Sequence, residues 1–356
     1  MLRITVVGIA RSPMDAPCYI DGMATSGPRN LITDVPGILV GQAEDSAAIT
    51  GTTVIVAERP AIAAVDVRGG APGSRETELL AAGTLVDRVD AVVLSGGSAF
   101  GLDAASGAMD FLAAHGRGFA VGEARVPIVP AAILFDLGLP GRRHWTGEPP
   151  HRRLGHAAAG AAGKDFALGN AGAGLGATAG ALKGGLGSAS LRLADGGTVG
   201  AIVAVNCVGG VVRPDCGRFW AADLALGGEI APQPPNPNQP LDLDDFSACG
   251  SLLAGANTTI ALVATDAPLD KNSCRRLAIM AQDGLSRAIR PAHTPFDGDT
   301  VFALSTGAGR PIGPEALTRV GSAAADCLAR AIMRGVMAAA PLGGFPSWRQ
   351  KWGGAR

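Results

Sequence analysis

Aromatic and charged side chains are both scarce in this sequence. Only 4% of its 356 residues are aromatic, with a single tyrosine, and 17% are charged. Hydrophobic residues still make up 47% of the chain, so a large core must be built mainly from alanine, valine, leucine and isoleucine. The formal net charge is -1 and no long basic run occurs, which argues against a nucleic-acid-binding surface with its clustered lysines and arginines.

The sequence also lacks the patterns of a metal centre, a disulfide framework or a membrane span. Its six cysteines are scattered and form no CxxC pair, so we expect buried thiols. No stretch approaches 18 uninterrupted apolar residues. The apolar run from Ile4 to Ala10 is short and contains Gly8, which makes it a poor secretory signal. We therefore predict a cytoplasmic protein without a bound metal, cofactor, membrane or nucleic acid.

Strand and helix patterns alternate along the chain and favour stacked sheets covered by helices. Residues 1–27 read as a loose N-terminal extension, residues 138–160 as an irregular basic excursion, and the proline-rich stretch 232–240 as an exposed linker. The predicted strands are 52–56 and 61–67 around a turn at 58–60, then 91–94, 198–205, 258–265 and 300–306. The predicted helices are 101–115, 271–290 and 314–340.

Several familiar site patterns fail on inspection. The glycine-rich run 172–176 resembles a dinucleotide fingerprint, but no strong strand leads into it. A serine-hydrolase elbow at Ser98 would need glycine where Phe100 stands. The five histidines show no metal-binding spacing, and His293 is better explained as structural. The Asp297-Gly298-Asp299 segment lacks the further acidic ligands of a calcium loop.

The segment Asn257-Thr258-Thr259, just before a predicted strand, offers a different chemistry. A threonine hydroxyl needs an adjacent base, and an N-terminal threonine carries one in its own α-amine. That amine has a reference pKa of about 7.7–8.0, so part of it is neutral near pH 7. Thr258 Oγ would first attack the Asn257 carbonyl, and hydrolysis of the resulting ester would free the amine. The same residues also fit a plain strand start or a glycosylation sequon, so taken alone they leave the choice open.

Six segments taken together narrow that choice. They are Thr33–Gly37, Asp66–Gly73, Leu94–Leu102, Lys183–Gly187, Ala256–Ile260 and Asp297–Thr300. In this order they resemble the DmpA-type aminopeptidase family, which includes β-aminopeptidases and nylon-oligomer hydrolases, and the resemblance runs from about Asn30 to Ala340. It implies one domain with the four-layer αββα sandwich of the N-terminal-nucleophile type, shared with ornithine acetyltransferases. Cleavage between Asn257 and Thr258 would divide it into fragments 28–257 and 258–356, which stay associated.

The resemblance also implies roles for individual residues. Thr258 is the nucleophile, and Asn206 helps to hold the oxyanion or the substrate. Lys183 matches an active-site lysine of the nylon-hydrolase branch, and Asp297 and Asp299 match the pair that orients the new α-amine. Independently, residues i and i+2 of an extended segment point to one face, so the two carboxylates can converge on one ammonium. The plain alternative is an Asp-Gly-Asp turn before a strand.

Phe135 is a departure from the family pattern. Many relatives have a tyrosine in the segment that matches 133–136, where its hydroxyl donates to the oxyanion, and phenylalanine cannot do this. Loss of one such donor costs about 10²–10³ in rate. Either the substrate differs, or another group fills the role, or activity is weak.

The function implied is hydrolysis of an amide bond through an acyl-enzyme. One candidate is an aminopeptidase acting on short peptides, β-amino peptides included; the other is an endohydrolase of linear amide oligomers. The threonine nucleophile and the Asp-Gly-Asp motif lean slightly to the second. The rivals are an acyl transferase of the ornithine acetyltransferase type, whose cleavage motif differs from Asn257–Ile260, and an inactive relative acting as a scaffold, for which Phe135 is the sole support. A homo-oligomer, a tetramer of cleaved pairs, is also expected.

Overall fold

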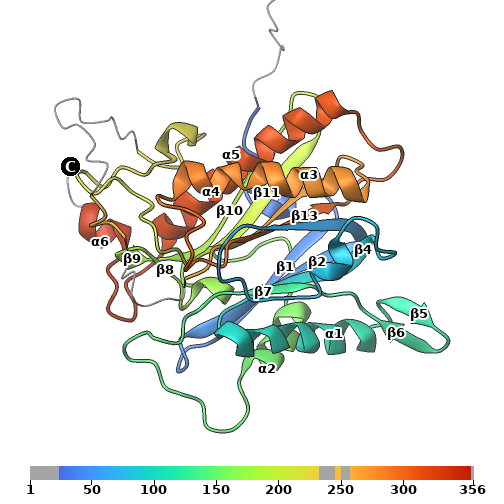
Figure 1. Cartoon of the computed structure of the whole chain (residues 1–356), viewed down its shortest axis with the longest axis horizontal. Helices are drawn as coiled ribbons and strands as arrows, with labels where there is room; N and C mark the ends of the chain where they lie inside the picture. Colours follow the sequence, from blue (N-terminus) through green and yellow to red (C-terminus); the bar gives the residue numbers. More distant parts are fainter. Residues whose placement is uncertain (1–23, 232–244, 250–256, 354–356) are drawn as a thin grey trace, which may run out of the picture.

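The computed structural model describes residues 24–231, 245–249 and 257–353 (Figure 1). The predicted extension 1–27 lies mostly outside these residues, and so does the whole linker 232–240. The strands are β1 (Ile38–Asp45), β2 (Thr50–Val67), β3 (Ser74–Arg75), β4 (Arg88–Ser95), β5 (Phe119–Val121), β6 (Ala124–Val126), β7 (Ala131–Ile133), β8 (Thr178–Ala179), β9 (Leu182–Lys183), β10 (Gly185–Arg192), β11 (Thr198–Val205), β12 (Ile260–Thr265) and β13 (Thr300–Ser305). The α-helices are α1 (Ala104–Ala114), α2 (His151–Gly160), α3 (Lys271–Ala281), α4 (Asp283–Ala288), α5 (Pro314–Ala338) and α6 (Trp348–Trp352). The 3-10 helices are η1 (Ile32–Asp34), η2 (Glu78–Leu80), η3 (Ser98–Asp103), η4 (Gly172–Gly174) and η5 (Ala222–Leu224).

The long strand β2 joins two sheets. Nine strands are hydrogen-bonded in the order β10-β11-β12-β13-β2-β4-β7-β3, with β1 also paired to β2. The first half of β2 pairs with β1, and its second half pairs along the same edge with β13. The strands β10 to β13 therefore form one sheet with the end of β2, while β1, β4, β7 and β3 form the other with its beginning.

Alternating side chains divide the apolar residues into three cores. In β12, Ile260, Leu262 and Ala264 point into the core between the two sheets. Ala261 and Val263 point the other way, toward the helices above. A third core lies between the second sheet and the helices below it. This period of two is what a strand buried on both faces requires.

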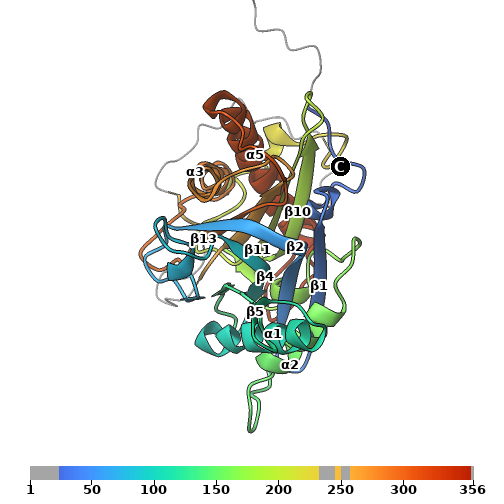
Figure 2. The same cartoon turned by 90° about the vertical axis from the view of Figure 1, so that its right-hand side faces the viewer.

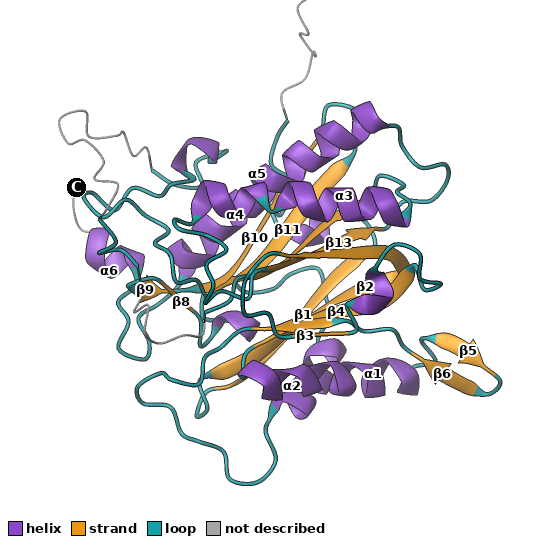
Figure 3. Ribbon diagram, in the orientation of Figure 1, coloured by secondary structure: helices purple, strands orange, loops and turns teal. Residues whose placement is uncertain are grey.

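Helices cover both outer faces of the paired sheets. The helices α3, α4 and α5 pack over one sheet, and α1 and α2 pack under the other. Figure 1 shows this layering from the side, Figure 2 gives the perpendicular view, and Figure 3 separates helices from strands by colour. The architecture is the predicted four-layer αββα sandwich.

Two sequence-based boundaries were wrong. Residues 50–67 form one strand rather than two, because β2 bends through the exposed stretch 58–60, where its register with β4 shifts between Val56 and Ala61. Pro60 sits in this unpaired stretch, where a missing N–H is tolerated. The predicted helix 271–290 is two helices, α3 and α4, separated at Gln282.

The basic excursion at 138–160 was also partly wrong, because its last ten residues form α2. Two features of the sequence led us to miss this helix: the charged pair Arg152 and Arg153, and Gly155 at its centre. Gly155 is required there, since a Cβ atom would lie 1.9 Å from the Ala104 carbonyl oxygen of α1. Close packing of two helices through a glycine therefore replaced the broad apolar stripe that sequence patterns detect.

The cysteines and helices of the described residues show no cross-link and no membrane span. The five described cysteines are free thiols, and Cys207, Cys274 and Cys327 among them are buried. None of the helices in this part of the chain combines the length and apolar character needed to cross a bilayer.

Candidate active site

Three strand ends bring the predicted site residues together. Thr258 lies two residues before β12, and Asp299 lies directly before β13, its parallel neighbour. Asn206 follows β11, which runs antiparallel to β12, so the end of β11 meets the start of β12. Sheet topology thus gathers at one edge residues that are about 40 to 90 positions apart in the sequence.

The peptide bond between Asn257 and Thr258 is hydrogen-bonded on both sides. The Gly298 N–H donates to the Asn257 carbonyl oxygen at 3.0 Å, and the Thr258 N–H donates to the Asn206 carbonyl oxygen at 2.5 Å. Thr258 Oγ lies 2.7 Å from the same Asn257 oxygen. The hydroxyl therefore sits beside the carbonyl group that it would attack, and a backbone donor already polarises that group.

Asp299 orders the backbone next to Thr258. Its Oδ1 accepts the Thr259 N–H at 3.0 Å, and its Oδ2 accepts the His293 N–H at 3.0 Å. The His293 ring nitrogen Nδ1 also lies 2.8 Å from Oδ2. His293 thus supports a site residue, a role that no motif in the sequence indicated.

Asp297 links its own loop to the segment that follows β11. Its Oδ1 accepts the Val208 N–H at 3.2 Å, and its Oδ2 accepts the Thr294 hydroxyl at 2.6 Å. Burial, followed by the neighbouring charge of Asp299, raises the pKa of Asp297. In the uncleaved chain neither carboxylate hydrogen-bonds Thr258 among the described contacts. The predicted orienting of the amine concerns the cleaved chain.

Asn206 is held at both ends of its side-chain amide. Oδ1 accepts the Thr178 N–H at 2.8 Å, and Nδ2 donates to the Phe135 carbonyl oxygen at 3.1 Å. Asn206 is fully buried and Phe135 is half-buried. Phe135 therefore contributes to the site through its main-chain oxygen. Thr178, whose hydroxyl also donates to Oδ1 at 3.3 Å, was missed, because its shorter contact is made by a backbone amide, which leaves no side-chain signature in the sequence.

Lys183 lies behind this group rather than against Thr258. Its ammonium is fully buried and donates to the carbonyl oxygens of Gly174, Ala177 and Gly184 at 3.0, 2.7 and 2.9 Å. Burial lowers the pKa of Lys183 to about 7, and the negative charge of Asp136 opposes that shift. Its catalytic role stays a prediction, since it makes no hydrogen bond to Thr258 among the described residues.

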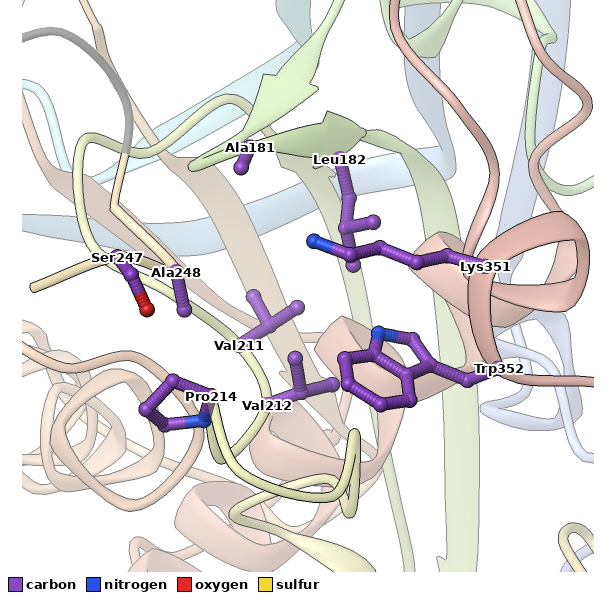
Figure 4. A pocket seen from close by; sticks show the side chains of 9 residues that line it. All are labelled: Ala181, Leu182, Val211, Val212, Pro214, Ser247, Ala248, Lys351 and Trp352. Atoms are coloured by element: carbon purple, nitrogen blue, oxygen red, sulfur yellow. The ribbon is translucent and has the colours of Figure 1, made fainter.

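A small pocket lies near this region but is not large enough for a peptide (Figure 4). Its volume is about 20 Å³, room for about one water molecule. Figure 4 shows β9 and α6 contributing to its wall. The lining residues are Ala181, Leu182, Val211, Val212, Pro214, Ser247, Ala248, Lys351 and Trp352. Within the described residues no group of His, Cys, Asp and Glu side chains is arranged to hold a metal.

Comparisons with known proteins match both the sequence and the fold of this chain. An uncharacterized aminopeptidase of Mycobacterium tuberculosis is 48% identical over 92% of this chain and 99% of its own length. A 6-aminohexanoate-oligomer endohydrolase of Paenarthrobacter ureafaciens is 31% identical over 79% of this chain and 76% of its own length.

A β-aminopeptidase of a Burkholderia species has a similar solved structure, with a TM-score of 0.67 at 25% identity, covering 93% of this chain and 94% of that one. An L-aminopeptidase D-Ala-esterase/amidase of Ochrobactrum anthropi shares the fold, with a TM-score of 0.65 at 21% identity over 91% of this chain and 90% of that one. Residues 30–348 match Peptidase family S58. The chain therefore belongs to peptidase family S58 and is a hydrolase of amide bonds.

Proposed function

We propose that the chain cleaves itself between Asn257 and Thr258, and that Thr258 then serves as the N-terminal nucleophile of the hydrolase. The main support for this proposal is that the Asn257–Thr258 peptide bond is hydrogen-bonded on both sides. Asn257 O accepts from Gly298 N–H, Thr258 N–H donates to Asn206 O, and the Thr258 hydroxyl donates to Asn257 O at 2.7 Å. A plain strand start does not need a reactive hydroxyl against the preceding carbonyl.

The cleavage proceeds in two steps. Thr258 Oγ attacks the Asn257 carbonyl carbon, and the Gly298 N–H stabilises the negative charge that develops on the Asn257 oxygen. The C–N bond then breaks, and the hydroxyl proton ends on the Thr258 nitrogen, which leaves an ester between Asn257 and the threonine oxygen. Water hydrolyses that ester to the Asn257 carboxylate and a free Thr258 amine.

Catalysis on a substrate repeats this chemistry with the new amine as base. The neutral Thr258 amine takes the hydroxyl proton, Oγ attacks the substrate amide, and the amine product leaves. Water then releases the acyl group. Asn206 lies beside Thr258 and is placed to contribute a donor, since one hydrogen of its NH₂ group bonds Phe135 and the other has no partner among the described residues.

Short peptides with a free N-terminus are the substrate class that we favour. The relatives with nearly half of their residues identical are named aminopeptidases. A second candidate is a linear amide oligomer, favoured by the threonine nucleophile, the Asp297-Gly298-Asp299 motif and the relative named for 6-aminohexanoate oligomers. We further propose that fragments 28–257 and 258–356 stay together and that the cleaved pairs assemble into tetramers.

Denaturing mass spectrometry of the purified wild type tests the proposal. We expect two masses, the smaller of which corresponds to Thr258–Arg356. Amine release is then measured on α-peptides, β-peptides and 6-aminohexanoate oligomers, and acetyl transfer from acetylornithine to glutamate tests the transferase alternative. A chain that stays whole after long incubation would refute self-cleavage and favour the scaffold alternative.

Gly298→Ala is expected to slow self-cleavage by about 10²-fold, because a displacement near 1 Å at a reacting group has an effect of that size. A Cβ atom at Gly298 would lie 2.7 Å from the Ala71 carbonyl oxygen, 2.7 Å from Thr258 Oγ and 3.0 Å from Thr258 Cγ2, so the variant displaces the Gly298 backbone, the Thr258 side chain or both. The fraction of cleaved chain is measured over time after synthesis. Gly313→Ala is the matched control, since a Cβ atom there meets nothing within 4 Å. Equal cleavage rates in the two variants would contradict the assigned geometry.

A further inference from the structure

The placement of Asn206 depends on two loops that approach it from opposite ends of its side chain. Thr178, the first residue of β8 directly after the turn 174–177, holds Oδ1, and the segment that contains Phe135 holds Nδ2. The main-chain oxygen of Asn206 accepts the Thr258 N–H at 2.5 Å. Whatever fixes these two loops therefore fixes one side of the peptide bond that the proposed function breaks.

Lys183 fixes the first loop. Its three ammonium hydrogens are used by three carbonyl oxygens, of Gly174, Ala177 and Gly184. A protonated lysine has three donors and no acceptor, so nothing on this side chain is left for a substrate. A neutral amine has only two hydrogens and cannot satisfy the same three oxygens. The ammonium form of Lys183 therefore links the turn 174–177 to β9, the strand to which Lys183 belongs.

Asp136 fixes the second loop and touches the first. It follows Phe135, is 2% exposed, and accepts the Gly97 N–H on Oδ1 at 2.8 Å. A Cβ atom at Gly176 would lie 2.6 Å from Asp136 Cβ and 2.8 Å from Asp136 Oδ2. Gly176 belongs to the turn whose carbonyl oxygens bind Lys183. That turn therefore has the lysine ammonium bonded to it and the aspartate carboxylate packed against it.

We propose that Asp136 and Lys183 form a buried positioning pair, whose opposite charges hold two loops together and so fix Asn206 against the bond that precedes Thr258. This inference rests on the proposed self-cleavage. Neither side chain touches the reacting atoms, so both act through Asn206. The pair assigns Lys183 a positioning role in place of a catalytic one and adds Asp136, to which no motif assigned a role.

The pair is charged only in a narrow range of pH. Burial lowers the pKa of Lys183 to about 7, so its ammonium is lost as pH rises through that value. Burial raises the pKa of Asp136 to about 6, so its carboxylate is lost as pH falls through that value. Of the neighbouring groups, Arg142 favours the carboxylate, and His151 is neutral in this range because burial lowers its pKa to about 4. The pair is strongest between about pH 6 and 7.

The pH profile of self-cleavage distinguishes a positioning lysine from a catalytic base. Full-length chain is made by cell-free translation, and its cleavage rate is measured from pH 5.5 to 9. The Thr258 nitrogen is an amide at this stage and does not titrate. Asp136→Asn keeps the size and the acceptor for Gly97 but removes the charge that favours the Lys183 ammonium. We expect cleavage about three- to eightfold slower at pH 7.5, with the alkaline limb moved to lower pH by about 0.5–1 unit.

A lysine acting as base predicts the opposite sign. Without the Asp136 charge more of Lys183 would be neutral, so Asp136→Asn would then cleave faster than the wild type near pH 6.5, and that result would overturn the pair. Asp110→Asn is the matched control, because Asp110 is an exposed carboxylate paired with Arg152 on the surface. Its profile should follow the wild type.

Hydrogen exchange of residues 174–184 gives a readout that does not depend on cleavage. We expect at least threefold faster exchange in Asp136→Asn than in the wild type at pH 6.5, and no change in Asp110→Asn. If the wild type never cleaves, the proposed function fails while this measurement still tests the pair. Unchanged exchange in Asp136→Asn would overturn the pair even in a chain that cleaves normally.

Discussion

Replacing Thr258 by alanine is expected to leave the chain whole and to reduce amide hydrolysis by roughly a thousandfold or more, the size of loss seen when a covalent nucleophile is removed. The variant lacks the oxygen that lies 2.7 Å from the Asn257 carbonyl oxygen, so neither the ester nor an acyl-enzyme can form. Cleavage is read by denaturing mass spectrometry, and hydrolysis by amine release from short peptides.

Thr259 provides a closely matched control for Thr258. It is the next residue, it is fully buried, and its hydroxyl has no hydrogen-bond partner among the described residues. Thr259→Val keeps the shape and removes a hydroxyl that gains nothing from burial, so the variant should cleave like the wild type and be at least as stable. A Thr258→Ala chain that is cut, beside a Thr259→Val chain that stays whole, would move the nucleophile by one residue.

Arg330→Met is expected to destabilise the fold by about 3–5 kcal/mol, as removal of one partner from a buried ion pair does. The Arg330 side chain is 1% exposed and donates to Glu229, to Asn30 Oδ1 and to the Ser190 carbonyl oxygen. The variant leaves the Glu229 carboxylate buried with Arg334 as its remaining cation, at 3.8 Å. The free energy of unfolding is measured from urea denaturation followed by circular dichroism.

The same helix carries a surface ion pair for comparison. Arg319 lies 3.3 Å from Glu315, and their side chains are 45% and 93% exposed. Arg319→Met should change the free energy of unfolding by about 0.5 kcal/mol or less. If the two arginine variants unfold at the same urea concentration, then the ion pairs of Glu229 with Arg330 and Arg334 do not hold α5 (Pro314–Ala338) in place.

The strands of the central sheets were the most predictable part of the fold. β11 and β13 lie within one residue of the predicted ranges, because an apolar run bounded by polar and glycine residues has few other solutions. The helix α2 was not predictable, since its packing depends on Gly155 touching a helix far away in sequence. Local periodicity reports how much apolar surface a segment has, and it cannot report a close backbone approach.

The candidate site also has a part that the sequence could predict and a part that it could not. Thr258 was expected at the start of one strand and Asn206 at the end of another, but the pairing of β11 with β12, which brings them together, was not predicted. Asp297 and Asp299 were expected to share a face, yet their carboxylates bond different backbone amides, because residues 297–299 belong to a bridge and loop before β13 rather than to a regular strand. The three acceptors around the Lys183 ammonium are backbone carbonyl oxygens. Every residue carries such an oxygen, so no pattern of side chains could predict this arrangement.

The sheet order determines how a cut chain would refold. β12 and β13 both follow Thr258, yet they lie between β11 and β2, which precede it. An uncut chain folds in a unimolecular reaction, whereas two separated fragments must meet before the central strands can pair. Recovery after denaturation should therefore depend on protein concentration for the cut form and be independent of it for the uncut form. The durability of the mature protein would then be set by its unfolding rate rather than by an equilibrium.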